Sequence, residues 1–478
     1  VGLNGLIKEN SDKLEEKVIA ILQKVKEEGF SDIKIKALIH QLELSRKVEN
    51  ASFGLNVLSS LVSNWVSNVD PINSLKWDDI VLKFKDDYSK RGDFIFKDLI
   101  EKHFLTKPYF KYTMKPDENF SKLVAQEEKE RLKSKVEKLT EEDREVVYNR
   151  GIKLLEKQEE KEDLSCLPTV NVSDISREIP FLRINNKYEQ GIPIQSRLSP
   201  KTNGLSYFRG IKCIKASELN QDLISYLPLF SSCLTNLGTN SKTMADLEDE
   251  IKLTTGGLSS SFFTHASPYD TNEVYLKFSL SSVCLDSEFG KMLSLWQQIL
   301  LDTNFKNISK LSTLIKSSTA DSLSDIVSGG HSYARSAASS KVSPVGNIQE
   351  LLGGIHSIKF MNELAVFEAE GSLAENVVPK LEKIKEILLS GSGLQYSVTT
   401  SKDVIRAQES QVLKFNDQLN FMGSFEKKPY EFEVPSGVIL KNQFIKIPSH
   451  VSFSSTALCA PSYSSKESAS LQILSQLL

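Results

Sequence analysis

Histidine and cysteine side chains are the first candidates for chemistry, because they supply many metal ligands and nucleophiles. The sequence contains six histidines and five cysteines, which are scattered along the chain without a C-x-x-C pair. It has no His-x-x-Glu-His or His-Glu-x-x-His motif, so we predict no catalytic residue and no metal ligand within it. The spacing also argues against a zinc ribbon and a secreted disulfide framework. These residues are His40, His103, His265, His331, His356, His450, Cys166, Cys213, Cys233, Cys284 and Cys459.

Three local patterns imitate functional motifs, and we interpret them as structural. His40 and Glu43 match half of a metal motif, but they are typical of a histidine on a helix face beside a solvent-facing glutamate. Glycine pairs lack the spacing of phosphate-binding loops, so they predict turns and helix ends. Serine clusters such as Ser339 and Ser340 predict polar loops rather than nucleophiles.

The composition excludes some classes of function. A net charge of -3 provides no field for nucleic acid or an anionic membrane, and no apolar run approaches the ~18 residues of a membrane span. The 478 residues contain 40% apolar and 25% charged residues, which is typical of soluble globular proteins of roughly three domains. The chain has no initiator Met and ends within an apolar helical pattern, so we expect a piece of a longer protein.

Residues 119–163 are the most distinctive segment, because more than half of those from Gln126 onward are charged. Sparse apolar residues keep helical spacing, which predicts two solvated helices with a narrow apolar stripe. A break near Lys138, Leu139 and Thr140 predicts a tight turn, with Thr140 as N-cap of the second helix. We interpret the segment as a rigid connector with its hinge at this turn; an ordinary pair of surface helices is the alternative.

The segments on either side of this connector predict an α+β fold. Before it, helices are expected at 14–25, 33–46, 53–65, 77–88 and 94–104, and a strand at 109–114. After it, paired strands alternate with helices, including strands at 192–198 and 205–214 joined by an Asn203-Gly204 turn. A helix is expected at 348–367, and a strand pair at 438–447 and 451–460 after a polar boundary. We therefore expect a mainly antiparallel sheet with helices packed on one face.

Several segments together resemble mitochondrial presequence proteases, with fungal members most similar. These are zinc metallopeptidases of the pitrilysin, or inverzincin, type. The resemblance runs in one order over nearly the whole chain. It is carried by DLSCLP at 163–168, VSDI at 172–175, TNGLSYFR at 202–209, LPLF at 227–230, LTNLG at 234–238, IKLTTGG at 251–257, GHSYA at 330–334, QLEL at 41–44, FGL at 53–55 and Asp70-Pro71.

The resemblance implies four related α+β domains in two halves, which are joined by a helical hairpin and close around a chamber. On this map, residues 1–118 are the end of the second domain and 119–163 the hinge. Residues 164–420 are the third, non-catalytic domain, and 421–478 open the fourth. The family degrades cleaved presequences and other unstructured peptides in mitochondria without ATP, with the matrix favoured over the intermembrane space.

The resemblance places the zinc site outside this chain. In the family, zinc polarises the scissile carbonyl, and a glutamate of His-x-x-Glu-His is the general base. We therefore expect this chain to be inactive alone and to need the missing N-terminal catalytic half as its partner. One alternative is a non-catalytic scaffold of the same superfamily, similar to core subunits of respiratory complexes. Another is an adaptor that uses the hairpin as a docking arm.

Cys166 follows the hinge directly on this map. We hypothesise that it forms a disulfide with the missing half under oxidation and so locks the closed chamber. The alternative is a partly buried, inert thiol. The resemblance identifies no substrate-binding residue in this chain.

Overall fold

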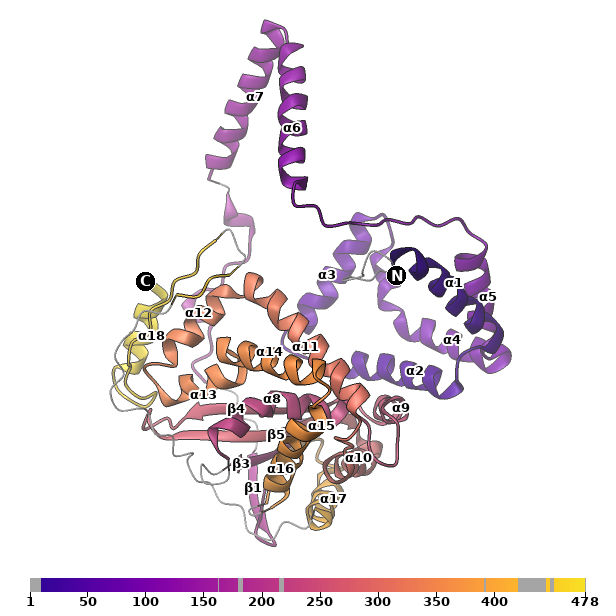
Figure 1. The fold of residues 1–478 in the computed structure, drawn as a ribbon, viewed down its shortest axis with the longest axis vertical. Helices are drawn as coiled ribbons and strands as arrows, with labels where there is room; N and C mark the ends of the chain where they lie inside the picture. The colour runs from indigo at the N-terminus through magenta and orange to yellow at the C-terminus, as the bar shows by residue number, and fades with distance from the viewer. Residues whose placement is uncertain are drawn as a thin grey trace. The chain divides into compact units, whose positions relative to one another are not determined.

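The computed structural model describes residues 10–161, 163–178, 184–214, 219–390, 393–419, 444–447 and 451–477 (Figure 1). The chain forms two compact units. One contains residues 1–29 and 85–181, and the other contains residues 30–84 and 182–478. Helix α4 (Trp77–Arg91) crosses the boundary between them. For residues 1–7 the sequence predicts a strand followed by the start of a helix, and these residues lie outside the described ones.

The smaller unit is helical. Helix α1 (Ser11–Glu28) ends at Gly29, whose φ of 78° needs a residue without Cβ. It packs on α5 (Phe94–Ile100) and on the π-helical turn Glu101–Leu105. The Nζ atom of Lys26 lies 2.8 Å from a carboxylate oxygen of Glu101.

The strand expected at 109–114 is wrong. This segment is irregular, and Phe110 and Tyr112 are 87% and 74% exposed. No described strand pairs with this segment. Its contact is with the carboxylate of Glu15, which accepts hydrogen bonds from the side chains of Tyr109 and Lys111. Alternating apolar residues do not make a strand when no neighbouring strand satisfies the backbone.

The charged segment forms the expected helical hairpin. Helix α6 (Phe120–Glu137) and helix α7 (Glu141–Glu159) contain no buried residue. Thr140 Oγ1 accepts a hydrogen bond from the Asp143 amide, and the Asp143 carboxylate accepts one from the Thr140 amide. This capping box starts α7 at the predicted residue. Two 3-10 turns follow, Leu164–Cys166 and Val172–Asp174.

The larger unit is built on a six-stranded sheet with the order β1-β2-β6-β3-β5-β4. All neighbours are antiparallel except the parallel pair β2 and β6. The strands are β1 (Ile184–Glu189), β2 (Ile192–Leu198), β3 (Leu205–Ile214), β4 (Leu258–Ala266), β5 (Val274–Leu285) and β6 (Gln395–Thr400).

The expected pairing of 192–198 with 205–214 is wrong, although both strands exist. Strand β6 lies between β2 and β3 and pairs with each of them. The hairpin partner of β2 is β1, which the sequence analysis did not identify. Gln190 and Gly191, with φ values of 54° and 78°, make the turn between them. The sequence also predicts strands at 258–265 and 273–283 as a hairpin, and β4 and β5 confirm it.

Helices cover one face of this sheet, as predicted for an α+β fold (Figure 1). Phe208 of β3 is buried there, with its ring 5.9 to 6.2 Å from those of Tyr396, Phe415 and Phe289. The helices are α8 (Gln221–Asn236), α9 (Met244–Thr254), α10 (Phe289–Asp302), α11 (Ile308–Ser328), α12 (Gly330–Ser339), α13 (Pro344–Gly353), α14 (Ile355–Ala369), α15 (Leu373–Asn376), α16 (Val378–Leu389) and α17 (Ile405–Gln418), with a 3-10 turn at Asp286–Glu288.

Two further expectations need correction. The helix predicted at 348–367 is divided between α13 and α14 at Gly353 and Gly354, because Gly354 is extended, with ψ of -161°. Residues 451–460 are irregular rather than a strand, and most of its expected partner at 438–447 lies outside the described residues. Helix α18 (Ser468–Leu477) confirms the apolar helical pattern near the end of the chain.

Residues 30–84 pack on this sheet unit through α2 (Asp32–Lys47). The Gln41 side-chain amide donates hydrogen bonds of 2.6 Å to the carbonyl oxygens of Lys252 and Thr255, which lie at the end of α9. Leu44 is only 2% exposed. Two of the segments that carry the family resemblance are therefore in contact, namely 41–44 and 251–257. Helix α3 (Phe53–Val66) and the 3-10 turn Pro71–Leu75 follow α2.

Candidate functional site

The face of the sheet opposite the helices carries the candidate site. A hollow of about 750 Å³ lies on it, at the middle strands of the sheet. Side chains along a strand alternate between faces, so β3 directs Phe208 to the core and Tyr207, Arg209 and Ile211 to this open face. We call this surface the open-face hollow.

The strand register arranges the polar side chains of this face in rows. In one row Asn186, Gln195, Ser397, Arg209, Ser281 and Ser259 are successive partners across all six strands. In the next row Arg197, Thr399, Tyr207 and Val283 are successive partners. Neighbouring strands are ~4.8 Å apart, so each row presents side chains that are close enough to contact one ligand together.

The two arginines of the hollow differ in how they are held. Arg197 donates from Nε and Nη2 to Gln195 Oε1, over 3.0 and 2.7 Å. Gln195 in turn donates from Nε2 to Asn186 Oδ1 over 3.1 Å. Arg209 is exposed and makes no hydrogen bond or ion pair with any residue that the structure describes. None of the described residues that line the hollow is acidic.

Tyr207 provides a neutral donor between the arginines and the rim. Burial, with a smaller effect from the negative charge of Glu49, raises the pKa of the Tyr207 phenol above its usual value. Its hydroxyl therefore stays protonated near pH 7. The open-face hollow thus combines cationic groups, hydroxyl groups and the apolar side chains of Ile211 and Val283, which suits a peptide segment with a negative group.

The rim beside α9 is formed by Gly256 and Gly257. The Gly256 amide donates to the Val283 carbonyl oxygen over 2.7 Å, which joins this turn to β5. A Cβ on Gly256 would lie 2.8 Å from a methyl group of Val283, and Gly257 has a φ of 126°. Both positions therefore require glycine for geometric reasons, in agreement with the interpretation of this pair as a turn.

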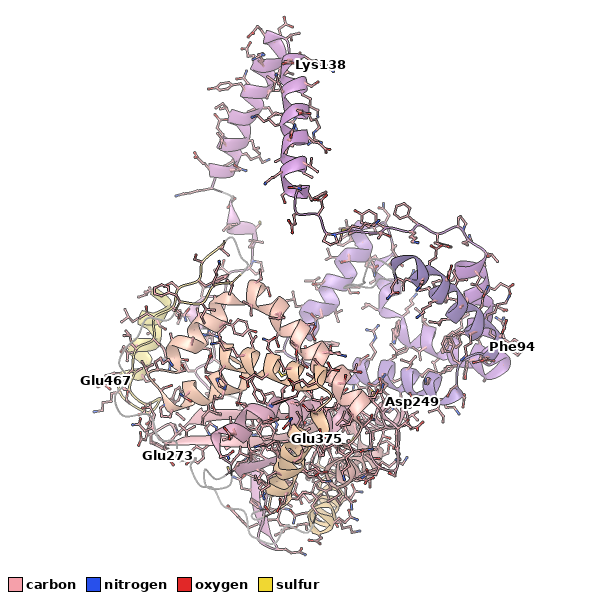
Figure 2. The ribbon with its side chains drawn as sticks, viewed as in Figure 1. Phe94, Lys138, Asp249, Glu273, Glu375 and Glu467 are labelled. Carbon is pink, nitrogen blue, oxygen red and sulfur yellow. The ribbon has the colours of Figure 1, made fainter. Side chains whose placement is uncertain are left out.

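The residues predicted for the hinge lie together at the tip of the hairpin. Lys138 follows the last residue of α6, Leu139 is half-buried, and Thr140 caps α7 (Figure 2). The Arg144 guanidinium donates to the Val136 carbonyl oxygen over 3.5 Å and links the two helices at this end. These contacts show a defined turn, and hinge motion at these residues stays a prediction.

Cys166 lies in the 3-10 turn after the hairpin and is exposed in this chain. Disulfide formation and an inert thiol both stay predictions. The nearest polar contact of Cys166 is the Asp163 carbonyl oxygen, 3.9 Å from Sγ. Among the cysteines, Cys459 is also exposed, and no two of them are bonded within this chain.

The described histidines lie apart in the fold. Among the described residues, no group of three or more His, Cys, Asp or Glu side chains is arranged to hold a metal ion. His265 stacks on Tyr275, with ring centroids 5.2 Å apart, and His331 lies against Phe453. The Nε2 atom of His40 is buried without a hydrogen-bond partner, and burial lowers its pKa. The donor set therefore does not fit zinc.

Residues 114–364, more than half of the chain, match the family described as associated with peptidases of family M16, subfamily C, and the chain belongs to that family. Among the described residues, none of the helices is long and apolar enough to cross a membrane.

Curated relatives are named as mitochondrial presequence proteases. That of Yarrowia lipolytica is 36% identical over 482 residues, which cover 100% of this chain and 47% of the relative. That of Debaryomyces hansenii is 37% identical over 518 residues, which cover 100% and 48%. That of Saccharomyces cerevisiae is 36% identical, with coverage of 95% and 45%. The chain therefore spans about half the length of these relatives.

A solved structure of a peptidase M16 inactive domain from Pseudomonas fluorescens aligns with 52% of this chain and 53% of its own. The TM-score is 0.34 and the identity is 10%.

The sequence alone predicts no substrate-binding residue, although Tyr207 and Arg209 lie in the segment TNGLSYFR at 202–209. Strict alternation in 205–214 was the available signal, because it separates Tyr207 and Arg209 from the buried Phe208. What the sequence did not show is that Arg197 and Thr399 come from strands two and one places away in the same sheet.

Proposed function

We propose that this chain is the central to C-terminal part of an ATP-independent zinc metalloendopeptidase of mitochondria, which degrades presequences and other unstructured peptides. The observation that carries this proposal is the similarity to presequence proteases over the whole chain at 36% and 37% identity. The chain also matches only about half of each relative, which leaves room for a catalytic half elsewhere.

In this proposal the chain supplies the hinge and one wall of a closed chamber. The hairpin of α6 and α7 is the connector, with its turn at Lys138, Leu139 and Thr140. The open-face hollow is the surface of the wall that meets the peptide. A closed chamber selects substrates by size and flexibility, because folded proteins do not enter it.

The domain boundaries remain part of the proposal. Residues 1–118 would be the end of a second domain, 119–163 the connector, 164–420 a third domain and 421–478 the start of a fourth. The matrix is the proposed compartment. Since the described residues do not fit zinc, its ligands are assigned to the catalytic half, and no catalytic step is assigned to residues of this chain.

The test is complementation. The chain is assayed alone and after mixing with the separately produced remainder of the protein, on a presequence-like unstructured peptide, with zinc content recorded. We expect hydrolysis and bound zinc only in the mixture. If the parts bind each other but the mixture neither holds zinc nor cleaves the peptide, the superfamily scaffold is supported instead.

A second measurement concerns Cys166, which we propose forms a disulfide with the catalytic half under oxidation. Non-reducing electrophoresis of the full-length protein with and without oxidant should show a mobility change that Cys166→Ser abolishes. Cys459→Ser is the matched control, because Cys459 is the other exposed cysteine among the described residues. An oxidised protein with unchanged mobility and activity contradicts the proposal.

A further inference from the structure

The open-face hollow carries positive charge, which a chamber wall does not by itself require. Two guanidinium groups line it, and no described residue in its lining is acidic. Arg209 lies on β3, within the sheet rather than at its edge. Arg209 is exposed on this face, and no described residue pairs with its guanidinium group.

The neighbours of Arg209 are donors as well. Ser397 on one side and Ser281 on the other are its direct partners in the register. Each lies one strand spacing away, ~4.8 Å, with its side chain on the same face. A negatively charged group above Arg209 would therefore accept from the guanidinium and from hydroxyls on both sides.

Arg197 extends this site in the neighbouring row. Its guanidinium is oriented by the two hydrogen bonds to Gln195 Oε1, which use Nε and Nη2. Because it is already held, Arg197 loses less conformational entropy on binding than a free side chain would. Arg197 therefore provides a fixed positive charge in the row next to Arg209, whose guanidinium group has no partner among the described residues.

We propose that Arg209, supported by Arg197, binds a carboxylate group of the peptide on the open face. This inference rests on the proposed function, and it adds a preference for chemical class. The planar guanidinium fork matches the two oxygens of a carboxylate. The carboxylate is either that of an Asp or Glu side chain or that of the peptide C-terminus.

The experiment measures peptide binding by the full 478-residue chain with isothermal titration calorimetry, without hydrolysis. Four unstructured peptides share one neutral sequence. One is amidated, one has a free C-terminus, one is amidated with a central Glu, and one is amidated with Gln at that position. We expect the carboxylate-bearing peptides to bind about tenfold more tightly than their neutral counterparts. Tighter binding of the peptide with the free C-terminus identifies the terminal carboxylate as the bound group. Tighter binding of the peptide with the central Glu identifies the side-chain carboxylate.

The variants assign the effect to the site. Arg209→Ala should remove the preference for carboxylate, and Arg209→Lys should keep part of it, because an ammonium retains charge without the fork. Arg406→Ala is the matched control, since Arg406 is exposed on α17, in the helical layer. Circular dichroism confirms that each variant is folded.

Three results overturn the inference. They are the absence of peptide binding, equal affinities for the carboxylate-bearing and the neutral peptides, and an Arg209→Ala variant that still prefers the carboxylate. Because no cleavage is measured, failure here leaves the complementation result standing. Conversely, a failed complementation does not alter a measured carboxylate preference.

Discussion

The Nζ atom of Lys212 lies 2.9 Å from the carbonyl oxygen of Leu388, within the last turn of α16. Lys212 is 1% exposed, and it also donates to the carbonyl oxygens of Ile387 and Ser390. Carbonyl groups at a helix C-terminus have no partner within the helix and carry the negative end of its dipole. A lysine from the central strand β3 thus terminates a helix of the covering layer.

Replacing Lys212 should therefore destabilise the sheet unit. We expect Lys212→Met to lower the free energy of unfolding by about 2–4 kcal/mol, because buried carbonyl groups of α16 lose a charged donor. Urea denaturation followed by circular dichroism measures this. Lys383→Met is the control on the same helix, where an exposed pair with Glu386 should contribute no more than ~0.5 kcal/mol. Equal stability of the two variants would contradict the assignment.

The capping box at Thr140 should determine where α7 begins. Thr140→Ala removes the acceptor for the Asp143 amide, and we expect a loss of about 1 kcal/mol in the local stability of the first turn of α7. Hydrogen exchange of the amides in that turn provides the measurement. Thr140→Ser keeps the hydroxyl and should exchange as the wild type does; fast exchange in this variant would show that the hydroxyl is not what protects the turn.

Glycine-to-alanine substitutions should change stability in opposite directions at two positions, one just after the end of α8 and one inside α7. Gly238 has a φ of 79°, and a Cβ there would lie 2.8 Å from the Lys242 carbonyl oxygen. Gly238→Ala should cost at least about 1 kcal/mol of stability. Gly151 lies inside α7 with nothing within 4 Å of a Cβ, so Gly151→Ala should stabilise the hairpin by ~0.5–1 kcal/mol. Thermal unfolding and hydrogen exchange distinguish the two, and effects of the same sign would be inconsistent with this backbone geometry.

His40 should make stability depend on pH. Burial lowers the pKa of its imidazole below the ordinary 6.5, against the opposing effects of Glu43 and Glu288. The unfolded chain then binds more protons than the folded protein, so stability is full above pH ~6.5 and falls as the pH drops below it. His40→Gln should flatten the stability profile between about pH 7 and pH 5. His103→Gln, at an exposed histidine, should not, and an unchanged slope in His40→Gln would assign the dependence elsewhere.

Local signals in the sequence were sufficient for most of the helices and for several of their ends, although they missed the division of 348–367 into α13 and α14. Gly29, Thr140 and Gly238 act on backbone groups within one turn of themselves, so their effects are visible in a short window of sequence. The charged hairpin was predictable for the same reason. The α+β class also followed, because the two periodicities of hydrophobic residues alternate along the chain.

Only the tertiary structure decided the order of the strands and the open face. The alternation of apolar and polar residues predicted a strand at 109–114, but this segment has no partner strand. The same pattern gave no sign that β6 lies between β2 and β3. Pairing between strands far apart in the chain depends on the burial of the whole covered face, which no local window contains. For that reason the sequence by itself determined most of the helices, the charged helical hairpin and the class of fold, while the meeting of Arg197, Thr399 and Tyr207 in one row required the folded sheet.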